Sequence, residues 1–326
     1  MKEEEIRPKK IFDEYLRLTA LDTASYFSNV ENQSILCPAC GSQGNFQFEK
    51  LGFSYELCPV CDSLYVSPRP NSQSFSEYYT NSPSAKYWAD VFYKETAVAR
   101  KEKIWKPKVS LVFDILAKFN CNRHTLIDVG GGYGIFAQLV EETTGKKCIV
   151  VEPNPYLAKH CRDQSLAVVE KFLEKIDEAD LPQTSRVFVS FELFEHLHDP
   201  NLFLQNLKSL MGKDDYFIFS TLSSTGVDIR TLWADSKSVS PPHHLNFFNP
   251  FSVKLLLKQV GMQCVEVTTP GRLDIDIMAN NQYSISDRFW SSFIKHATDD
   301  QKNILQKALA DTGWSSHMMI VAKLID

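Results

Sequence analysis

The stretch that decides the fold is Thr125-Leu-Ile-Asp-Val-Gly-Gly-Gly-Tyr-Gly-Ile-Phe136. It predicts a buried strand, then a glycine turn, then the start of a helix. Glycines let the backbone turn sharply and approach a ligand closely, because they carry no Cβ. The next apolar strand, Ile149-Val-Val-Glu-Pro-Asn154, ends at Glu152, where a carboxylate can accept hydrogen bonds from ribose hydroxyls. Together the two stretches predict a nucleotide-cofactor site.

Apolar stretches of strand length alternate with stretches of helical periodicity along the rest of the chain. Strands are predicted at 125–130, 147–152, 166–169, 186–191, 215–221, 262–268 and 317–324. Helices are predicted at 134–143, 155–163, 200–211 and 250–260, with a further helix pair around 286–311. Strands that alternate with helices through short connections form a mostly parallel sheet covered on both faces, so the expected fold class is α/β.

The order of the glycines separates two kinds of cofactor site. A dinucleotide site has the pattern Gly-x-Gly-x-x-Gly, whereas this loop reads Gly130-Gly-Gly132-Tyr-Gly134 and an acid, Asp128, stands two residues before it. The loop resembles motif I of class I S-adenosylmethionine-dependent methyltransferases, in which an acid precedes Gly-x-Gly-x-Gly. The alternative interpretation is a tight turn between strand and helix that binds no ligand.

The resemblance implies a Rossmann-like fold with a seven-stranded sheet whose last strand is antiparallel. It also implies that the loop holds the methionine part of S-adenosylmethionine, and that the acid after the second strand binds the ribose. The residues that it assigns to cofactor binding are Asp128, Gly130, Gly132, Gly134, Glu152, Pro153, Phe191 and Glu192.

Two histidine-containing runs are candidates for the chemistry. The run Ser190-Phe-Glu-Leu-Phe-Glu-His-Leu-His-Asp-Pro200 resembles the Glu-x-x-Glu-His-x-x-Asp-Pro loop of the branch that includes ubiquinone-biosynthesis O-methyltransferases, which implies that His196 faces the acceptor. The same branch has a His-x-x-Phe/Tyr-Phe pattern that matches Pro241-Pro-His-His-Leu-Asn-Phe-Phe248. There His243 or His244 could take a proton from an acceptor hydroxyl. The alternative for each histidine is a structural role.

Two Cys-x-x-Cys pairs, Cys37-Pro-Ala-Cys40 and Cys58-Pro-Val-Cys61, are separated by 17 residues. This spacing is typical of a zinc ribbon, in which two tight turns aim four thiolates at one metal ion, with a hairpin predicted between them. A catalytic zinc ion keeps an open coordination position. Four thiolates close the shell, so a structural zinc ion is the favoured interpretation, although such a site could still position a substrate or partner.

The run from Cys58 to Pro70, followed by Tyr78-Tyr79, resembles the N-terminal module of a bacterial group of these methyltransferases. In that group a zinc ribbon precedes the catalytic domain, and members often act in sugar or surface-polysaccharide biosynthesis. Asp62 stands where glycine is usual, and aspartate tolerates the left-handed conformation of such a turn. The expected domains are an N-terminal helix at 1–34, the zinc ribbon at 35–68, a helical connector at 69–118, and a methyltransferase domain at 119–326 with an insertion at about 270–316. A linker is predicted at 67–72, across the boundary between the ribbon and the connector.

The composition is that of an ordinary globular protein, with a net charge of −5 that disfavours broad binding to nucleic acid. No stretch is apolar enough to span a bilayer, and the acidic first residues do not resemble a signal peptide, so a reducing, cytoplasmic setting is expected. The eight cysteines are then metal ligands or buried thiols and do not form disulfides.

We therefore expect a methyltransferase that uses S-adenosylmethionine, with a structural zinc ion. The expected reaction is O-methylation, or alternatively C-methylation, of a sugar, a nucleotide-linked sugar or a related small molecule. Two alternatives are an RNA methyltransferase, whose binding would weaken steeply with salt, and a zinc-ribbon interaction protein with an inactive cofactor fold. Arg272, Asp274 and Asp276 could bind a polar acceptor or could lie in a solvated loop.

Overall fold

In the computed structural model of the protein, residues 1–325 are described, so Asp326 at the end of the predicted 119–326 domain lies outside them. The chain divides into two compact units, each built from segments far apart in sequence. The ribbon unit comprises Met1–Ala99, Leu222–Val253 and Thr268–Met318. The sheet unit comprises Arg100–Thr221, Lys254–Val267 and the residues from Met319 onward. The domain boundaries expected from the sequence stay predictions.

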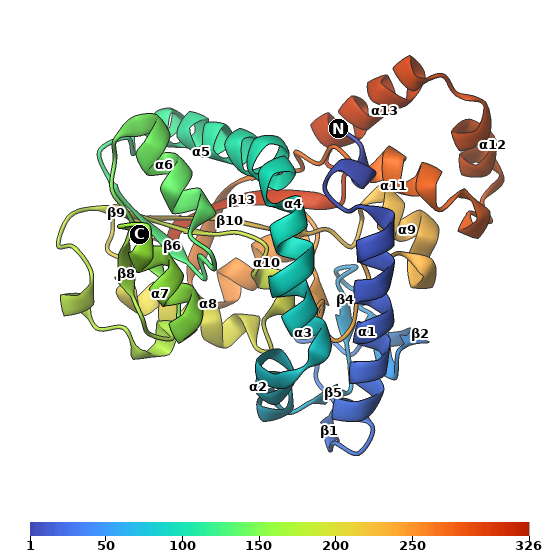
Figure 1. Ribbon diagram of the computed structural model, residues 1–326, viewed down its shortest axis with the longest axis horizontal. Coiled ribbons are helices and arrows are strands. Elements are labelled where there is room, and N and C mark those ends of the chain that lie inside the picture. The colour runs from blue at the N-terminus through green and yellow to red at the C-terminus, as the bar shows by residue number, and fades with distance from the viewer. Residues whose placement is uncertain (326) are drawn as a thin grey trace. The chain divides into compact units, whose positions relative to one another are not determined.

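A seven-stranded sheet forms the centre of the sheet unit (Figure 1). Its strands lie in the order β12-β13-β10-β9-β6-β7-β8, and β13, the last in the chain, is antiparallel. The strands span Thr125–Val129 (β6), Cys148–Val151 (β7), Ala167–Val169 (β8), Arg186–Ser190 (β9), Tyr216–Leu222 (β10), Met262–Thr268 (β12) and His317–Leu324 (β13). Each agrees with a predicted strand to within about one residue, and the expected fold class is confirmed.

Helices alternate with these strands, as predicted. They are α5 (Lys106–Lys118), which follows the π-helical segment η3 (Lys101–Trp105), α6 (Ile135–Thr144), α7 (Pro155–Asp163), α8 (Pro200–Leu210) and α10 (Ser252–Gln259). Short 3-10 turns lie at Leu173–Lys175 (η4), Glu178–Asp180 (η5) and Phe194–His196 (η6). The Asn154 side chain caps α7, and the Asp199 side chain caps α8. Both caps are followed by proline, whose fixed φ suits the first helical position.

A second, four-stranded antiparallel sheet lies in the ribbon unit. Its order is β11-β4-β3-β2, with strands at Asn45–Lys50 (β2), Phe53–Leu57 (β3), Leu64–Val66 (β4) and Asn246–Phe247 (β11). The hairpin of β2 and β3 confirms the one predicted between the cysteine pairs. The outer strand β11 comes from much later in the chain and pairs Asn246 with Tyr65 and Phe247 with Leu64. The zinc ribbon is therefore not a self-contained N-terminal piece.

The other elements of the ribbon unit are helical. The N-terminal part contains η1 (Glu3–Glu5), α1 (Lys9–Phe27), α2 (Ser72–Asn81), α3 (Pro83–Tyr87), the π-helical segment η2 (Trp88–Phe92) and α4 (Tyr93–Arg100). The later part contains α9 (Val227–Leu232), η7 (Trp233–Asp235), α11 (Asp274–Asn280), η8 (Gln282–Ser284), α12 (Arg288–His296) and α13 (Asp299–Thr312). Helices α12 and α13 confirm the helix pair predicted around 286–311. With α9 and α11 they enclose an apolar core of their own (Figure 1).

The predicted linker at 67–72 is instead part of the folded ribbon unit. Arg69 and Pro70 form strand β5, which pairs with β1 (Asn32–Gln33). The Arg69 side chain is buried, and its guanidinium donates to the backbone oxygen of Val66 and to the Asn246 side chain. Prolines argue against a strand because they lack an N–H donor, and this edge pairing was therefore not visible in the sequence.

The run that contains Asp274 is likewise not a solvated loop. Asp274 is buried at the start of α11, where its carboxylate accepts hydrogen bonds from the Ser315 hydroxyl, the Ser316 backbone N–H and the Gln306 amide. These bonds tie α11 to α13 and to the entrance of β13. Asp276 accepts a hydrogen bond from the Glu3 backbone at 2.6 Å. Both carboxylates serve the packing of the ribbon unit.

Candidate active site

The glycine loop between β6 and α6 has the backbone that only glycine adopts without strain. Gly130, Gly132 and Gly134 have φ values of +72°, +57° and +71°. A Cβ at Gly130 would lie 2.7 Å from a Leu193 methyl carbon, whereas one at Gly132 would point into open space. The first glycine is thus needed for packing. The second leaves the backbone exposed to an approaching ligand.

Glu152 connects the loop to the end of β7. One carboxylate oxygen accepts a hydrogen bond from the Gly132 N–H at 2.9 Å, and the other accepts one from the Asn154 N–H, also at 2.9 Å. Burial raises the pKa of Glu152 above its usual value, and the two N–H donors offset only part of that rise. The next residue, Pro153, is half-buried between β7 and α7. The carboxylate is therefore held in a fixed place at the carboxyl edge of the sheet.

Asp128 lies beneath the loop at the end of β6. Its side chain is 3% exposed, and Oδ2 has no hydrogen-bond partner among the described residues. Burial, and next the charge of Glu152, raise the pKa of Asp128 to about 7. A buried carboxyl oxygen without a partner is costly, so this atom is suited to a ligand that supplies a donor or a positive charge.

Phe191 and Glu192, which follow β9, lie in the same unit and share a lysine that the sequence analysis missed. Lys108 of α5 is buried, and its Nζ lies 2.6 Å from Glu192 Oε1. The ammonium also lies over the rings of Phe191 and Trp105, with centroid distances of 4.9 and 5.1 Å. Glu192 itself has a φ of +55°, unusual for a residue other than glycine. The ion pair therefore holds a strained residue beside the loop.

One signal in the sequence could have identified Lys108. It stands on the apolar face of α5, four residues before Val112 and seven before Ile115, so the helical periodicity places a cation among core residues. A lysine is rarely buried unless it is paired. Such a position therefore calls for an acidic partner, which the structure supplies as Glu192.

A further acid, Glu195, is buried in η6 and accepts a hydrogen bond from the Thr221 hydroxyl at 3.1 Å. Burial, and next the charge of Glu192, raise the pKa of Glu195 to about 8. This edge of the sheet thus carries four carboxyl groups, those of Asp128, Glu152, Glu192 and Glu195, and one buried ammonium, that of Lys108. Glu195 and part of Asp128 are protonated at neutral pH, but the remaining carboxylates still outnumber the one ammonium, so this edge favours a cationic ligand.

The three candidate histidines fall in different units. His196 ends η6 in the sheet unit, half-buried, whereas His243 and His244 lie in the ribbon unit. His243 is buried, and its Nε2 lies 2.7 Å from the Tyr15 hydroxyl and 3.0 Å from the Tyr78 hydroxyl. Burial lowers the pKa of His243 to about 3, so this ring is neutral and connects α1 and α2 to the loop.

His244 has a different environment. Its Nδ1 lies 2.6 Å from the backbone oxygen of Ser238, and because a carbonyl only accepts, Nδ1 carries the proton. In the neutral ring Nε2 is then the basic nitrogen. The backbone oxygen of His244 accepts a hydrogen bond from the Tyr55 hydroxyl at 2.8 Å, which fixes the loop that carries the ring. Of the two neighbours, His244 has the geometry of a base.

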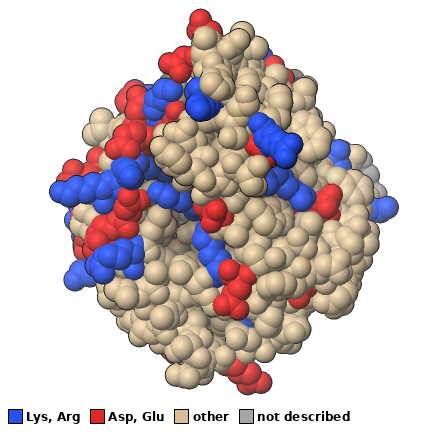
Figure 2. All heavy atoms as spheres, turned by 90° about the vertical axis from the view of Figure 1, so that its right-hand side faces the viewer, with Lys and Arg blue, Asp and Glu red and all other residues tan. Residues whose placement is uncertain are grey.

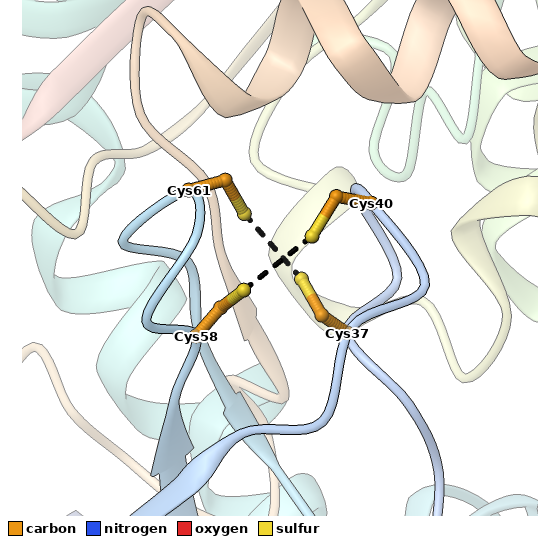
Figure 3. Close-up of side chains that lie close together, drawn as sticks. All are labelled: Cys37, Cys40, Cys58 and Cys61. Atoms are coloured by element: carbon orange, nitrogen blue, oxygen red, sulfur yellow. Dashed lines mark hydrogen bonds between the residues drawn. The ribbon is translucent and has the colours of Figure 1, made fainter.

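The four cysteines of the two pairs converge on one point (Figure 3). Cys37 and Cys61 Sγ are 3.5 Å apart, Cys40 and Cys58 Sγ are 3.4 Å apart, and all four sulfurs lie within 4.8 Å of one another. A tetrahedral zinc ion with Zn–S bonds of about 2.3 Å places its sulfurs about 3.8 Å apart. The cluster therefore fits a zinc ion bound by four thiolates.

The two knuckles have the same backbone. In each, the N–H of the residue after the second cysteine, Gly41 or Asp62, donates to the carbonyl of the first cysteine at 2.8 or 3.0 Å. Gly41 has a φ of +72° and Asp62 a φ of +56°, so aspartate adopts the left-handed turn expected from the sequence. Three of the other cysteines, Cys121, Cys148 and Cys161, are buried, and Cys264 is half-buried.

A family profile described as "Methyltransferase domain" matches residues 99–267, slightly more than half of the 326 residues. No curated protein matches the sequence. Among solved structures, the chain is similar to an S-adenosylmethionine-dependent methyltransferase from Clostridium acetobutylicum, with 9% identity, 72% of this chain and 99% of that chain covered, and a TM-score of 0.44. A SAM-dependent methyltransferase from Archaeoglobus fulgidus has 18% identity, coverage of 66% and 94%, and a TM-score of 0.42. The plantazolicin methyltransferase BpumL, in complex with SAH, has 8% identity, coverage of 77% and 94%, and a TM-score of 0.48.

The zinc site can be tested by replacing one ligand. Cys58→Ser should lower the zinc content of the purified protein from about one ion per chain to near zero, because three thiolates leave the shell incomplete. It should also lower the melting temperature. Metal analysis and thermal unfolding measure both effects, and Cys264→Ser, outside the cluster, is the control. Full zinc content in Cys58→Ser would contradict the assignment.

The buried carboxyl of Asp128 should give stability a characteristic pH dependence. The folded chain keeps this proton up to a pKa of about 7, whereas the usual value is 3.8, so the folded state binds more protons between these values. The contribution of Asp128 to the free energy of unfolding therefore falls as pH rises through this window. The stability of wild type relative to Asp128→Asn should fall by up to about 3 kcal/mol between about pH 5 and about pH 8 in urea titrations. An equal stability difference at both pH values would refute this expectation.

Proposed function

The chain belongs to the methyltransferase family whose profile matches residues 99–267, and from this premise we propose how its residues bind the cofactor and the acceptor. The protein is an S-adenosylmethionine-dependent methyltransferase. The single observation that carries the cofactor assignment is the glycine loop held by Glu152 above Asp128, whose Oδ2 has no hydrogen-bond partner within residues 1–325.

The residues present suit S-adenosylmethionine, which carries positive charge on its sulfonium and ammonium groups and two ribose hydroxyls. In the proposed arrangement Glu152 and Pro153 receive the ribose side, and the loop from Gly130 to Gly134 receives the methionine side. Asp128 lies beneath the loop, where its buried carboxyl is positioned for the cationic part of the cofactor. The excess of carboxyl groups at this edge supports a cationic ligand over the anionic pyrophosphate of a dinucleotide.

Phe191 and Glu192 form the neighbouring wall of the proposed cofactor site. The Lys108 ammonium pairs with the carboxylate of Glu192 at 2.6 Å, and the Ser220 hydroxyl donates to the same oxygen at 3.1 Å. With two donors on one oxygen, the side chain is fixed before any ligand binds. We assign Lys108 as a positioning residue, since its contacts are to Glu192, Ser220 and two rings.

The proposed reaction is methylation of a hydroxyl, or alternatively of a carbon, on a sugar, a nucleotide-linked sugar or a related small molecule. When bound, the cofactor supplies a methyl group on a good leaving group, so the protein chiefly aligns the acceptor and excludes water. A hydroxyl must lose its proton during or after the attack. We assign that proton to Nε2 of His244, because Nδ1 is held by Ser238. His196 and His243 stay candidate bases.

Several observations support a small acceptor over nucleic acid. The net charge is −5, and on the face drawn in Figure 2 the lysine and arginine side chains lie interspersed with aspartate and glutamate. Binding to a nucleic-acid backbone depends on a continuous basic surface.

None of the helices within residues 1–325 is both long and apolar enough to cross a membrane.

Calorimetric titration with S-adenosylmethionine tests the cofactor site. We expect saturable binding that is at least about tenfold weaker in Glu152→Gln, because an amide offers one acceptor oxygen where the carboxylate offers two. The control is Glu174→Gln, an exposed acid of the same unit. Folded wild-type protein that does not bind the cofactor would overturn the site, and equal affinity in Glu152→Gln would remove this residue from it. Nicotinamide dinucleotide, titrated in the same way, is the control for a dinucleotide site.

His244→Ala tests the base. Loss of a general base lowers turnover by about 10² to 10⁴, so we expect a decrease of this size in the transfer of labelled methyl groups to a sugar that the wild-type protein methylates. The affinity for the cofactor should stay unchanged within about twofold. His296→Ala, exposed on α12, is the matched control. A large loss of cofactor affinity in His244→Ala, or full turnover, would exclude the role.

A further inference from the structure

A pocket of about 420 Å³, to which Cys61 contributes, lies within the ribbon unit beside the zinc cluster. Four separate segments form it. The tip of the second knuckle contributes Val60 and Asp62, the segment between β10 and α9 contributes Thr225, and the segment that enters α10 contributes Phe251. The end of α13 and the turn after it contribute Thr312, Gly313 and Trp314. The volume lies within the usual range for a small-molecule site. The candidate cofactor and base residues are not among those that line it.

Two aromatic side chains line this pocket and stay largely in water. Phe251 is 57% exposed and Trp314 is 55% exposed. Their backbones are nevertheless held firmly. The Trp314 N–H donates to the Leu309 carbonyl, and the Trp314 carbonyl accepts from the Val227 N–H. The Phe251 N–H donates to the Asn249 side-chain oxygen at 3.0 Å. Exposed rings on a fixed backbone offer large apolar surfaces that a ligand can cover.

The backbone of the second knuckle is also fixed where it forms the pocket wall. Asp62 has a left-handed backbone, and its carbonyl accepts a hydrogen bond from the Ser224 hydroxyl at 2.6 Å. Asn249 donates to the Cys61 carbonyl at 2.7 Å, which ties the knuckle to the entrance of α10. The Asp62 carboxylate projects outward, 62% exposed, and Thr225 adds a hydroxyl to the lining.

The charge at the rim decides which class of ligand fits. Asp62 is the charged residue of the lining, and its carboxylate lies 3.7 Å from the guanidinium of Arg230, which is outside the lining, so its charge is balanced. An anionic nucleotide would meet the carboxylate, and a cationic peptide side chain would have to compete with the guanidinium that already pairs with it. A neutral ligand with hydroxyls on its edge and an apolar face suits both the ion pair and the aromatic rings. A pyranose ring has this chemistry.

We propose that this pocket binds a saccharide ring, with its apolar face on Trp314 and its hydroxyls at Asp62 and Thr225. The site is separate from the residues assigned to methyl transfer, and the proposal does not depend on that assignment. It follows that the ribbon unit binds a glycan or glycoconjugate at this pocket, which does not include the candidate base.

The test uses the zinc-loaded full chain and three neutral probes, methyl α-glucopyranoside, methyl β-galactopyranoside and N-acetylglucosamine. Binding is followed by saturation-transfer NMR and by tryptophan fluorescence, up to high millimolar concentration. We expect at least one probe to bind saturably. The affinity should fall at least about tenfold in Trp314→Ala and less than about threefold in Trp314→Phe, which keeps an aromatic surface. Tyr283→Ala, a fully exposed residue outside the pocket lining, should bind as wild type does.

Three outcomes would overturn the proposal. The first is that none of the three probes binds saturably. The second is that Trp314→Ala binds the saccharides as tightly as wild type does. The third is that the pocket binds ATP or arginine methyl ester more tightly than the saccharides. Calorimetry with S-adenosylmethionine on Trp314→Ala separates this site from the cofactor site, because unchanged cofactor affinity is expected there. If the alanine variant fails to fold, the wild-type titrations still decide the proposal, because absence of saturable binding of all three probes would overturn it.

Discussion

The cofactor edge depends on the hydrogen bond from the Gly132 N–H to the carboxylate of Glu152. It joins the turn after β6 to the end of β7 and so fixes two neighbouring strand ends relative to each other. The bond is charge-assisted and largely shielded from water, which makes it stronger than a neutral surface bond. It is also possible only because Gly132 takes a left-handed conformation, without which its N–H would point elsewhere.

The cost of this arrangement is concentrated at Asp128. Its carboxyl is buried under the loop next to a second acid, and its Oδ2 finds no hydrogen-bond partner in the described part of the chain, so this group would be more stable in water. Neighbouring Lys108 and Glu192 show the opposite solution, in which a buried charge is paired at 2.6 Å. A functional site commonly combines both, a rigid satisfied frame and one unsatisfied group that the ligand completes.

Periodicity and local motifs were enough to predict the central fold. The strands of the large sheet are apolar runs of ordinary length, and the helices carry clear caps such as Asn154 with Pro155 and Asp199 with Pro200, so their positions follow from nearby residues alone. The cysteine spacing predicted the convergence of four sulfurs for the same reason. What the sequence could not show are pairings between distant segments that have no local signal. The strand β11 is two residues long, and Arg69 finds its partner Asn246 only in the folded chain. The Lys108–Glu192 pair is of the same kind, although the periodicity of α5 did mark the lysine.

The addition of β11 to the ribbon sheet has a consequence for synthesis of the chain on the ribosome. When Leu64 and Tyr65 leave the exit tunnel, the edge of β4 has no partner, and it stays open until the segment that ends at Phe247 has emerged. An unpaired strand edge is a template for association with other chains, so nascent ribbons on neighbouring ribosomes are exposed to one another during that interval. A zinc ion bound by the four thiolates would close the two knuckles early, because it uses only residues already made. It would thereby keep the knuckles folded while β11 is still being translated.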